Sequence, residues 1–547
     1  MSFIGLNRLE QGPWPAFERM IARYLEHRGL QGVEVVGGAN DKGADIVASL
    51  NGKGWLVQAK FSAKSSAKKK AVEEAYKAQF AYKVNTIVVA TNQRFAPTAT
   101  RFKDELRDKG FDLHLWDRDY FLQEEEILEN NSKAKRELRS YQREAVDKLH
   151  LSLDSDRGKG LVTLATGLGK TVVASTFIAE YIERSRDSKV LVLAHLSNLV
   201  RQLDTACWSQ FSKDTETHVW TDGEKPAYNN GVTFATWQCV DAAMKRGEDF
   251  GSYFDLVVID ECHHAASLSY WSTIEALKPK YLLGLTATPF RGDNISLAPL
   301  FGEPVFSMNV VEGMQKGWLA EVDYKMMTDG IDWEYIKDLS KQGLSIKDLN
   351  AHLYVPERDQ GMVKTICETI DKTLKAKTLV FCRSIEHAER MQHFFKMFDT
   401  SAGVIHSQLH RAEKFNTMTA FRDGSLKVLI SIEMLNEGID VPDVNIIVFA
   451  RVTHSRRIFL QQLGRGLRLN DDKSDVTVLD FVADVRRVAE GIKMNSDAKK
   501  VKEEVRYPDG EIVKFSIHAQ GFFAEYLEDM ANLSDLDENS FLEFPPE

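Results

Sequence analysis

The chain has 547 residues, 43% of them hydrophobic, which is typical of a globular protein with several cores. No run of about 18 apolar residues exists and the start lacks the features of a secretion signal, so we expect a cytoplasmic protein that does not enter a membrane. Five cysteines without a Cys-x-x-Cys pair argue against a zinc ribbon or a disulfide framework. The formal net charge of -10 alone would discourage a nucleic-acid interpretation, but the acids are concentrated toward the C-terminus.

The first region alternates between helical and strand patterns. Apolar residues over 17–25 follow helical spacing, and the short strand Asp45-Ile-Val-Ala48 precedes a turn at Asn51-Gly52. Two further strands are predicted over 55–61 and 86–90, because both stretches are mostly apolar and the second is also rich in β-branched residues. These elements predict a compact α/β module.

A candidate nuclease site lies within this module. Asp45 is on one strand, and Gln58 and Lys60 share a face of the next strand, because strand side chains alternate. Asp45 and the carbonyl of Ala59 can bind Mg²⁺, which prefers oxygen ligands, and Glu18 can complete the shell. Lys60 can orient a water or neutralise a transition state. As a bare pattern this remains open, because an ordinary solvated sheet edge carries the same residue types.

From about residue 138 onward, two series of helices alternate with buried strands, which predicts two lobes with parallel sheets. We therefore expect an α/β protein with an N-terminal α/β module, two lobes built on parallel sheets and a small acidic C-terminal region. The expected boundaries are 1–125 for the first module, 126–310 for lobe 1, 311–487 for lobe 2 and 488–547 for the acidic region.

The first lobe opens with a phosphate-binding pattern, Thr166-Gly-Leu-Gly-Lys-Thr171. Gly167 and Gly169 permit a tight turn whose N–H groups point at phosphate oxygens, and the following helix adds its positive N-terminus. The ammonium of Lys170 can neutralise the β and γ phosphates of ATP. The hydroxyl of Thr171 can bind Mg²⁺.

A second motif, Asp260-Glu-Cys-His-His264, follows an apolar strand. Asp260 can hold Mg²⁺, Glu261 can orient and deprotonate the attacking water, and His263 can sense the nucleotide. In lobe 2, Arg465 and Arg468 are three residues apart on one predicted helical face, where guanidinium groups can stabilise charge on the γ phosphate. Taken alone, two such arginines are more often surface charge.

In this order, the motifs resemble the core of a superfamily 2 helicase of the DExH kind over about 138–485, and the variant is most similar to restriction-enzyme motor subunits. The resemblance implies DNA as the track more than RNA, and translocation at least as readily as strand separation. It also implies that Thr286 and Thr288 link hydrolysis to closure of the lobes. Further nucleotide contacts implied by the resemblance come from Gln142, Gly438, Asp440 and Gln461.

The first module contains four short stretches in this order: Phe17-Glu18, Asn40-Asp-Lys-Gly-Ala-Asp45, Gln58-Ala-Lys60 and Ala90-Thr-Asn92. With them it resembles the Mrr-like restriction endonuclease domain. The two resemblances imply a restriction-endonuclease-like α/β fold for this module and RecA-like folds for the two lobes. Gln58 replaces the acid of the general endonuclease motif, and the resemblance implies that Glu18 supplies the missing charge.

The leading hypothesis is an ATP-dependent DNA translocase or helicase coupled to a metal-dependent endonuclease, in restriction or antiviral defence. Its cofactors are ATP and Mg²⁺, and its partner is DNA, double-stranded more than single-stranded DNA or RNA. A remodelling or repair helicase whose first module binds DNA without cutting is the alternative. A third possibility is a subunit that binds a protein partner or itself through the acidic C-terminal region or the charged segment 328–360.

Overall fold

The computed structural model describes residues 2–37, 43–155, 158–228, 230–266, 268–287, 297–309, 312–313, 316–327, 358–382, 384–432, 443–450, 475–481 and 511–515. The chain divides into two compact units. The first holds the N-terminal module and most of lobe 1, over 1–164, 169–307 and 410–413. The second covers 165–168, 308–409 and 414–547.

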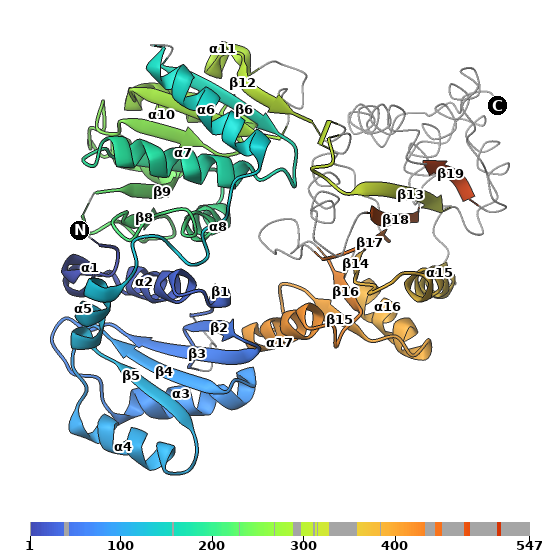
Figure 1. Ribbon diagram of the computed structural model, residues 1–547, viewed down its shortest axis with the longest axis horizontal. Helices are drawn as coiled ribbons and strands as arrows, with labels where there is room; N and C mark the ends of the chain where they lie inside the picture. The colour runs from blue at the N-terminus through green and yellow to red at the C-terminus, as the bar shows by residue number, and fades with distance from the viewer. Residues whose placement is uncertain are drawn as a thin grey trace. The chain divides into compact units, whose positions relative to one another are not determined.

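The N-terminal module is a five-stranded mixed sheet in the order β1-β2-β3-β4-β5. The antiparallel strands β1 to β3 form one side, and β3, β4 and β5 run parallel. Helix α2 covers one face, and α3 with α4 covers the other (Figure 1). The strands are β1 (Gln31–Val35), β2 (Ile46–Leu50), β3 (Lys53–Lys60), β4 (Thr86–Thr91) and β5 (Asp112–Trp116). The helices are α1 (Leu6–Gln11), α2 (Trp14–His27), α3 (Lys69–Tyr82), α4 (Pro97–Arg107) and α5 (Arg118–Ile127).

Lobe 1 is built on a seven-stranded sheet in the order β12-β6-β11-β10-β7-β9-β8. The strands from β6 to β8 in this order are parallel, and most of their residues are fully buried, as expected for a sheet covered on both faces. The strands are β6 (Lys159–Leu164), β7 (Val190–Ala194), β8 (Thr217–Trp220), β9 (Val232–Thr236), β10 (Leu256–Ile259), β11 (Tyr281–Thr286) and β12 (Pro304–Met308). The helices are α6 (Ser140–Asp154), α7 (Lys170–Arg184), α8 (Ser197–Cys207), α9 (Trp237–Lys245), the 3-10 helix η1 (Cys262–Ala266), α10 (Leu268–Leu277) and α11 (Ala298–Phe301).

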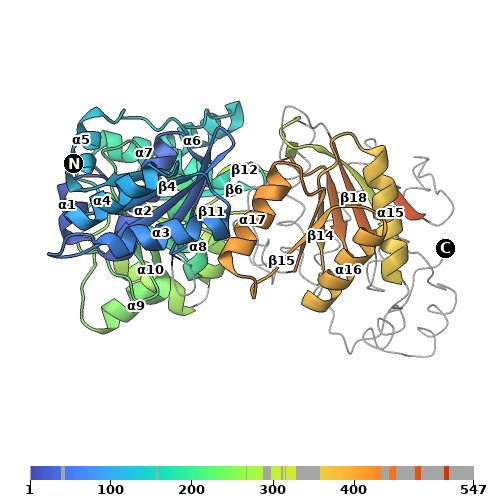
Figure 2. The ribbon, with the colours of Figure 1, turned by 90° about the horizontal axis from the view of Figure 1, so that it is seen from below.

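Lobe 2 contains a second seven-stranded sheet in the order β15-β16-β14-β17-β18-β13-β19. All its neighbouring strands are parallel except β19, which pairs antiparallel with β13. Helices α15 and α16 pack against each other beside this sheet (Figure 2). The strands are β13 (Glu321–Met327), β14 (Thr378–Phe381), β15 (Ala402–Ile405), β16 (Val428–Ser431), β17 (Ile446–Phe449), β18 (Asp475–Phe481) and β19 (Glu511–Phe515). The helices are α15 (Arg358–Lys372), α16 (Ile385–Met397) and α17 (Arg411–Arg422).

These sheets confirm the predicted α/β class, with a small mixed sheet followed by two largely parallel sheets. The four residue boundaries stay a prediction. Of the acidic region 488–547, only β19 lies among the described residues, and segment 328–357 lies outside them. Within the described ranges, none of the helices is both long and apolar enough to cross a membrane. All five cysteines are free thiols.

Candidate nucleotide and nuclease sites

The phosphate loop joins β6 to α7 at the carboxyl end of the lobe 1 sheet. Gly167 and Gly169 have φ angles of +94° and +83°, which favour glycine. A Cβ atom at position 169 would lie 2.5 Å from Gln142 Nε2, so a side chain there would displace Gln142. Gln142 is buried, and its Oε1 accepts a hydrogen bond from the backbone N–H of Arg139 at 3.0 Å. The structure thus brings Gln142 against the phosphate loop, although the two are far apart in sequence.

Lys170 and Glu261 form an ion pair across two strand ends. Lys170 Nζ lies 2.8 Å from Glu261 Oε1, and the two side chains are only 12% and 13% exposed. Burial alone lowers the pKa of Lys170, but the carboxylates of Glu261 and Asp260 outweigh that effect and raise it above its ordinary value. Lys170 is therefore charged at neutral pH. Thr166 lies in the loop and Thr171 in the first turn of α7, on either side of this lysine.

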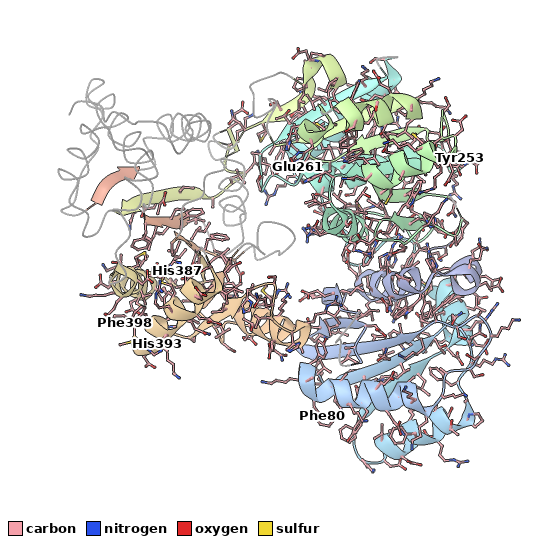
Figure 3. The ribbon with its side chains drawn as sticks, turned by 180° about the vertical axis from the view of Figure 1, so that it is seen from behind. Phe80, Tyr253, Glu261, His387, His393 and Phe398 are labelled. Atoms are coloured by element: carbon pink, nitrogen blue, oxygen red, sulfur yellow. The ribbon has the colours of Figure 1, made fainter. Side chains whose placement is uncertain are left out.

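Glu261 itself has an unusual backbone. Its φ of +48° lies in the left-handed region, which costs a residue with a side chain free energy and recurs at functional sites. The residue follows Asp260 directly after β10, and the N–H of Asp260 donates to the carbonyl of Leu193 at 3.0 Å. Figure 3 labels Glu261 on the lobe 1 ribbon.

A histidine, His263, lies beside this carboxylate, and two further histidines continue from it. His263 Nδ1 lies 3.2 Å from Thr286 Oγ1 and 3.4 Å from Glu261 Oε2. The ring of His264 lies 4.3 Å from that of His263 and 4.1 Å from that of His195, measured between centroids. The contact between His263 and Thr286 places the predicted sensor next to the end of β11. The contacts of His264 with His263 and His195 were not predicted, although His264 lies in the motif named above.

The predicted lobe 2 contacts lie outside the described residues, as does Thr288 of lobe 1. Their roles stay predictions. The lobe 2 residues concerned are Gly438, Asp440, Gln461, Arg465 and Arg468.

In the N-terminal module, Asp45 is held by two N–H donors. The side-chain amide of Gln58 donates to Asp45 Oδ2, and the backbone N–H of Ala59 donates to the same oxygen at 2.6 Å. Asp45 is 1% exposed and Gln58 2%. The donors fix the carboxylate without adding a formal charge. Gln58 therefore positions Asp45, a role that the strand pattern alone did not identify.

Glu18, on α2, approaches the other side of Asp45. A Cβ atom at Gly37 would lie 3.0 Å from both carboxylate oxygens of Glu18 and 3.3 Å from Asp45 Oδ1. The two carboxylates therefore converge on one glycine. Both are buried, and burying two like charges together is costly unless a cation or protons compensate.

Lys60 has a partner that was not predicted. Its Nζ lies 2.9 Å from Glu74 Oε2 on α3, in a pair whose side chains are 39% and 34% exposed. Lys70 Nζ approaches the other oxygen of Glu74 at 3.9 Å. No spacing in the sequence connects Lys60 with a residue fourteen positions later on a helix. Only the packing of α3 beside β3 brings them together.

The described residues at the two sites offer carboxylate and hydroxyl oxygens, the donor atoms that Mg²⁺ prefers. Among them, no group of three or more His, Cys, Asp and Glu side chains has metal-binding geometry. Mg²⁺ usually takes one or two carboxylates together with phosphate oxygens and waters. Asp260 with Thr171, and Asp45 with Glu18, are donor sets of that kind.

Comparisons with known families assign the three parts of the chain. Residues 9–124 match the family described as restriction endonuclease, and 135–291 match the type III restriction enzyme res subunit. Residues 361–470 match the helicase conserved C-terminal domain. The chain thus joins an N-terminal endonuclease domain of the Mrr type to the two domains of a superfamily 2 helicase of the restriction-enzyme type. The family resemblance that the motifs indicated is confirmed.

Two known relatives each match 63% of this chain. The putative ATP-dependent helicase IRC3 of Saccharomyces cerevisiae is 27% identical over 362 residues, covering 63% of this chain and 51% of the relative. The type I restriction enzyme EcoAI endonuclease subunit of Escherichia coli is 28% identical over 376 residues, covering 63% of this chain and 46% of the relative. The chain thus spans about half the length of these relatives.

Among solved structures, the ATP-dependent type ISP restriction-modification enzyme LlaBIII bound to DNA resembles this helicase with a TM-score of 0.53. The sequences are 17% identical, and the match covers 97% of this chain and 42% of that one. At this identity the likeness shows the fold alone.

Proposed function

We propose that the protein hydrolyses ATP to move along or remodel DNA and carries a Mg²⁺-dependent endonuclease that cuts it. The observation that carries the proposal is that one compact unit holds the Lys170–Glu261 pair at a phosphate loop and the Glu18–Asp45 pair in a restriction-endonuclease fold. Restriction or antiviral defence is the setting that joins these activities. The proposed location is the cytoplasm, without attachment to a membrane.

At the nucleotide site, the backbone N–H groups of the loop at Gly167 and Gly169 receive phosphate oxygens. ATP offers Lys170 a phosphate in place of Glu261, which releases Glu261 to take a proton from the attacking water. Thr171 and Asp260 hold Mg²⁺, and this ion when bound neutralises charge on the phosphates.

The remaining residues proposed for the nucleotide site contact other parts of ATP or respond to its state. Gln142 recognises the base and His263 reports the nucleotide state to Thr286. From lobe 2, Arg465 and Arg468 stabilise charge on the γ phosphate. The remaining nucleotide contacts are Thr166, Gly438, Asp440 and Gln461.

At the nuclease site, Glu18, Asp45 and the carbonyl of Ala59 would hold Mg²⁺, which would supply a water of lowered pKa and positive charge beside the phosphate. Gln58 keeps Asp45 turned toward Glu18. Lys60 neutralises the phosphate after exchanging its contact with Glu74 for the DNA backbone. Double-stranded DNA is the proposed substrate, and the acidic C-terminal region is the proposed surface for a protein partner or a second copy.

A remodelling or repair helicase with a non-cutting first module is the second candidate. It is favoured by the pair between Lys60 and Glu74 and by the amide of Gln58 at the position of the usual acid. Under this alternative, the module binds DNA and Asp45 has a structural role.

Incubation of plasmid and linear DNA with the full chain, Mg²⁺ and ATP separates the two candidates. The nuclease proposal predicts cutting that Asp45→Asn and Lys60→Ala abolish, while both variants keep DNA-stimulated ATP hydrolysis. Strand displacement or translocation without cutting, by wild type and Asp45→Asn alike, supports the second candidate instead.

A further inference from the structure

Helix α2 carries a nuclease-site residue next to a buried ionic cluster. Glu18 faces Asp45, whereas the following residue, Arg19, contacts lobe 1. Its guanidinium donates through both terminal nitrogens to the carboxylate of Glu224, at 2.9 Å for Nη1, and its Nε lies 3.4 Å from Asp204 Oδ2. The side chains of Arg19, Glu224 and Asp204 are 9%, 6% and 1% exposed, so the cluster is almost completely shielded from solvent.

Two more arginines of the endonuclease domain insert into the same part of lobe 1. Arg23 donates to the carbonyls of Thr215 at 2.7 Å and Ser212 at 2.9 Å. Arg8 donates to the carbonyl of Thr217 at 2.8 Å. Burial lowers the pKa of Arg23 to about 10, which leaves it charged at neutral pH. Planar guanidinium groups that bind fixed carbonyls set orientation as well as position.

The hydrophobic core continues across the same contact. Trp208, directly after α8 of lobe 1, belongs to the core cluster that includes Phe17 and Ile21 of α2. Its indole N–H donates to Asp204 Oδ1 at 3.0 Å. Asp204, which contacts Arg19, is therefore itself held by Trp208, whose side chain is buried in the endonuclease core.

On the lobe 1 side, Glu224 belongs to a series of polar contacts that leads to the start of α8. Arg201 lies 3.7 Å from Glu224 Oε2 and 3.6 Å from Asp222 Oδ2. The hydroxyl of Ser197 donates to Asp222 Oδ1 at 2.7 Å, and Thr221 Oγ1 donates to Ser197 at 2.8 Å.

The series ends at the carboxyl edge of the lobe 1 sheet. Thr221 Oγ1 lies 3.5 Å from the hydroxyl of Thr236, the last residue of β9. Strands β9, β7 and β10 are neighbouring and parallel, so Thr236 stands on the same edge as Glu261. Ligands of open parallel sheets bind at this edge.

We propose that Arg19 is a positioning residue for the nuclease, through which the carboxyl edge of lobe 1 sets the place of Glu18. The inference rests on the proposed function and adds a physical route between its two activities. A change at the carboxyl edge moves Glu224, Glu224 carries the guanidinium of Arg19, and the shared helix carries Glu18. A series of contacts becomes coupling only when a change at one end alters the other, which is measurable.

The test is the Mg²⁺ concentration that gives half-maximal DNA cleavage and half-maximal ATP hydrolysis, measured on the full chain. Glu224→Gln removes the negative charge while keeping the shape of the side chain. Arg19→Lys keeps the positive charge but loses the two parallel N–H donors of the guanidinium group. We expect each to raise the half-saturating Mg²⁺ for cleavage about 10-fold, the loss typical when a group that orients a metal ligand is removed. The value for ATP hydrolysis stays at that of wild type.

Arg28→Gln is the matched control. Arg28 caps the same helix and donates to Glu124 at 2.7 Å, but Glu124 lies on α5 of the endonuclease domain. This variant keeps the wild-type Mg²⁺ dependence. A purely structural role for Arg19 lowers the amount of active enzyme and leaves the half-saturating Mg²⁺ unchanged. If Arg19→Lys and Glu224→Gln both show that pattern, the inference is wrong.

Removing a partner from a buried ion pair is strongly destabilising, so a variant at a more exposed position is needed as well. Arg201→Gln changes a side chain that is 42% exposed. It is expected to shift the Mg²⁺ dependence of cleavage in the same direction by a smaller factor. Unchanged dependence in Arg201→Gln and Arg19→Lys overturns the inference even if Glu224→Gln does not fold.

Calorimetric titration of nucleotide-free protein with Mg²⁺ separates this inference from the proposed function. Binding that Asp45→Asn abolishes and Arg19→Lys weakens supports the positioning role even if wild type cuts no DNA, a result that overturns the nuclease proposal alone. Equal Mg²⁺ binding by Arg19→Lys and wild type overturns the positioning role.

Discussion

The two candidate sites of the first unit hold their carboxylates in different ways. At the nucleotide site, Glu261 pairs with the ammonium of Lys170 at 2.8 Å. At the nuclease site, Asp45 is held by the uncharged N–H donors of Gln58 and Ala59 and faces Glu18. At the first site the protein itself supplies the opposite charge, through Lys170. Under the proposed mechanism, Lys170 exchanges Glu261 for a phosphate oxygen of ATP. At the second site two buried carboxylates converge, and the proposed Mg²⁺ would offset their charge, so we expect metal to affect the stability of this site as well as its chemistry.

The largest expected effect follows from removing the base at the nucleotide site. Glu261→Gln keeps the shape but cannot accept the proton of the attacking water, so steady-state ATP hydrolysis falls by about 10²–10⁴-fold. Glu180→Gln is the control, because Glu180 also pairs with a basic partner in lobe 1, Arg143 at 2.7 Å, but lies away from the phosphate loop. Normal turnover by Glu261→Gln contradicts the assigned role.

Asp45→Asn makes the corresponding change at the nuclease site. Loss of groups that support a metal ligand costs 10- to 100-fold, so losing the ligand itself should lower cleavage by about 100-fold or more. ATP hydrolysis stays within the wild-type range because Asp45 belongs to the endonuclease domain, whereas all residues assigned to ATP lie beyond it in the sequence. Initial cleavage rates at saturating Mg²⁺ provide the measurement. An Asp45→Asn protein that cuts at the wild-type rate removes Asp45 from the site.

Gln58→Glu sharpens the comparison through stability. The change replaces a donor to Asp45 with a third carboxylate, and like charges in a buried site repel each other. Without divalent cation we expect a lower Tm than wild type, and added Mg²⁺ should raise it by more than it raises wild type, through binding to the folded state. Gln58→Met, which loses the donor without adding charge, should show the lower Tm without the recovery. Equal responses of the two variants to Mg²⁺ contradict a cation site there.

The smallest effect concerns Glu26, on the same helix as Glu18. Burial raises its pKa to about 7, although Arg23 and Arg136 act in the other direction. Its stabilising contribution is therefore complete below its ordinary pKa of 4.5 and is lost as pH rises through about 7. His218 acts oppositely, because burial lowers its pKa to about 3 and its contribution is lost as pH falls below 6.5.

Between pH 6.5 and 8 the effect of Glu26 is thus separable. We expect the Tm of wild type to fall over this interval and that of Glu26→Gln to fall less. Thermal denaturation curves at pH 6.5 and 8 give the two Tm values for each protein. An equal fall in Tm for wild type and Glu26→Gln counts against a raised pKa of Glu26.

The sequence predicted the nucleotide site more completely than the nuclease site, for a physical reason. The loop with its lysine follows β6 and Glu261 follows β10, two strands separated only by β11 in one parallel sheet, so their carboxyl ends lie at the same edge. Lys60 meets Glu74 only because α3 packs beside β3, which no local pattern encodes. Arg19 and Arg23 look like a charged helix face in sequence, yet they are buried because lobe 1 covers them.

The most direct measurement of the central claim is DNA-stimulated ATP hydrolysis and DNA cleavage recorded together for wild type, Glu261→Gln and Asp45→Asn. We predict that wild type performs both, that Asp45→Asn hydrolyses ATP without cutting, and that Glu261→Gln loses hydrolysis. Equal hydrolysis by wild type and Glu261→Gln, or equal cutting by wild type and Asp45→Asn, contradicts the assignment of a separate motor and nuclease to these two sites.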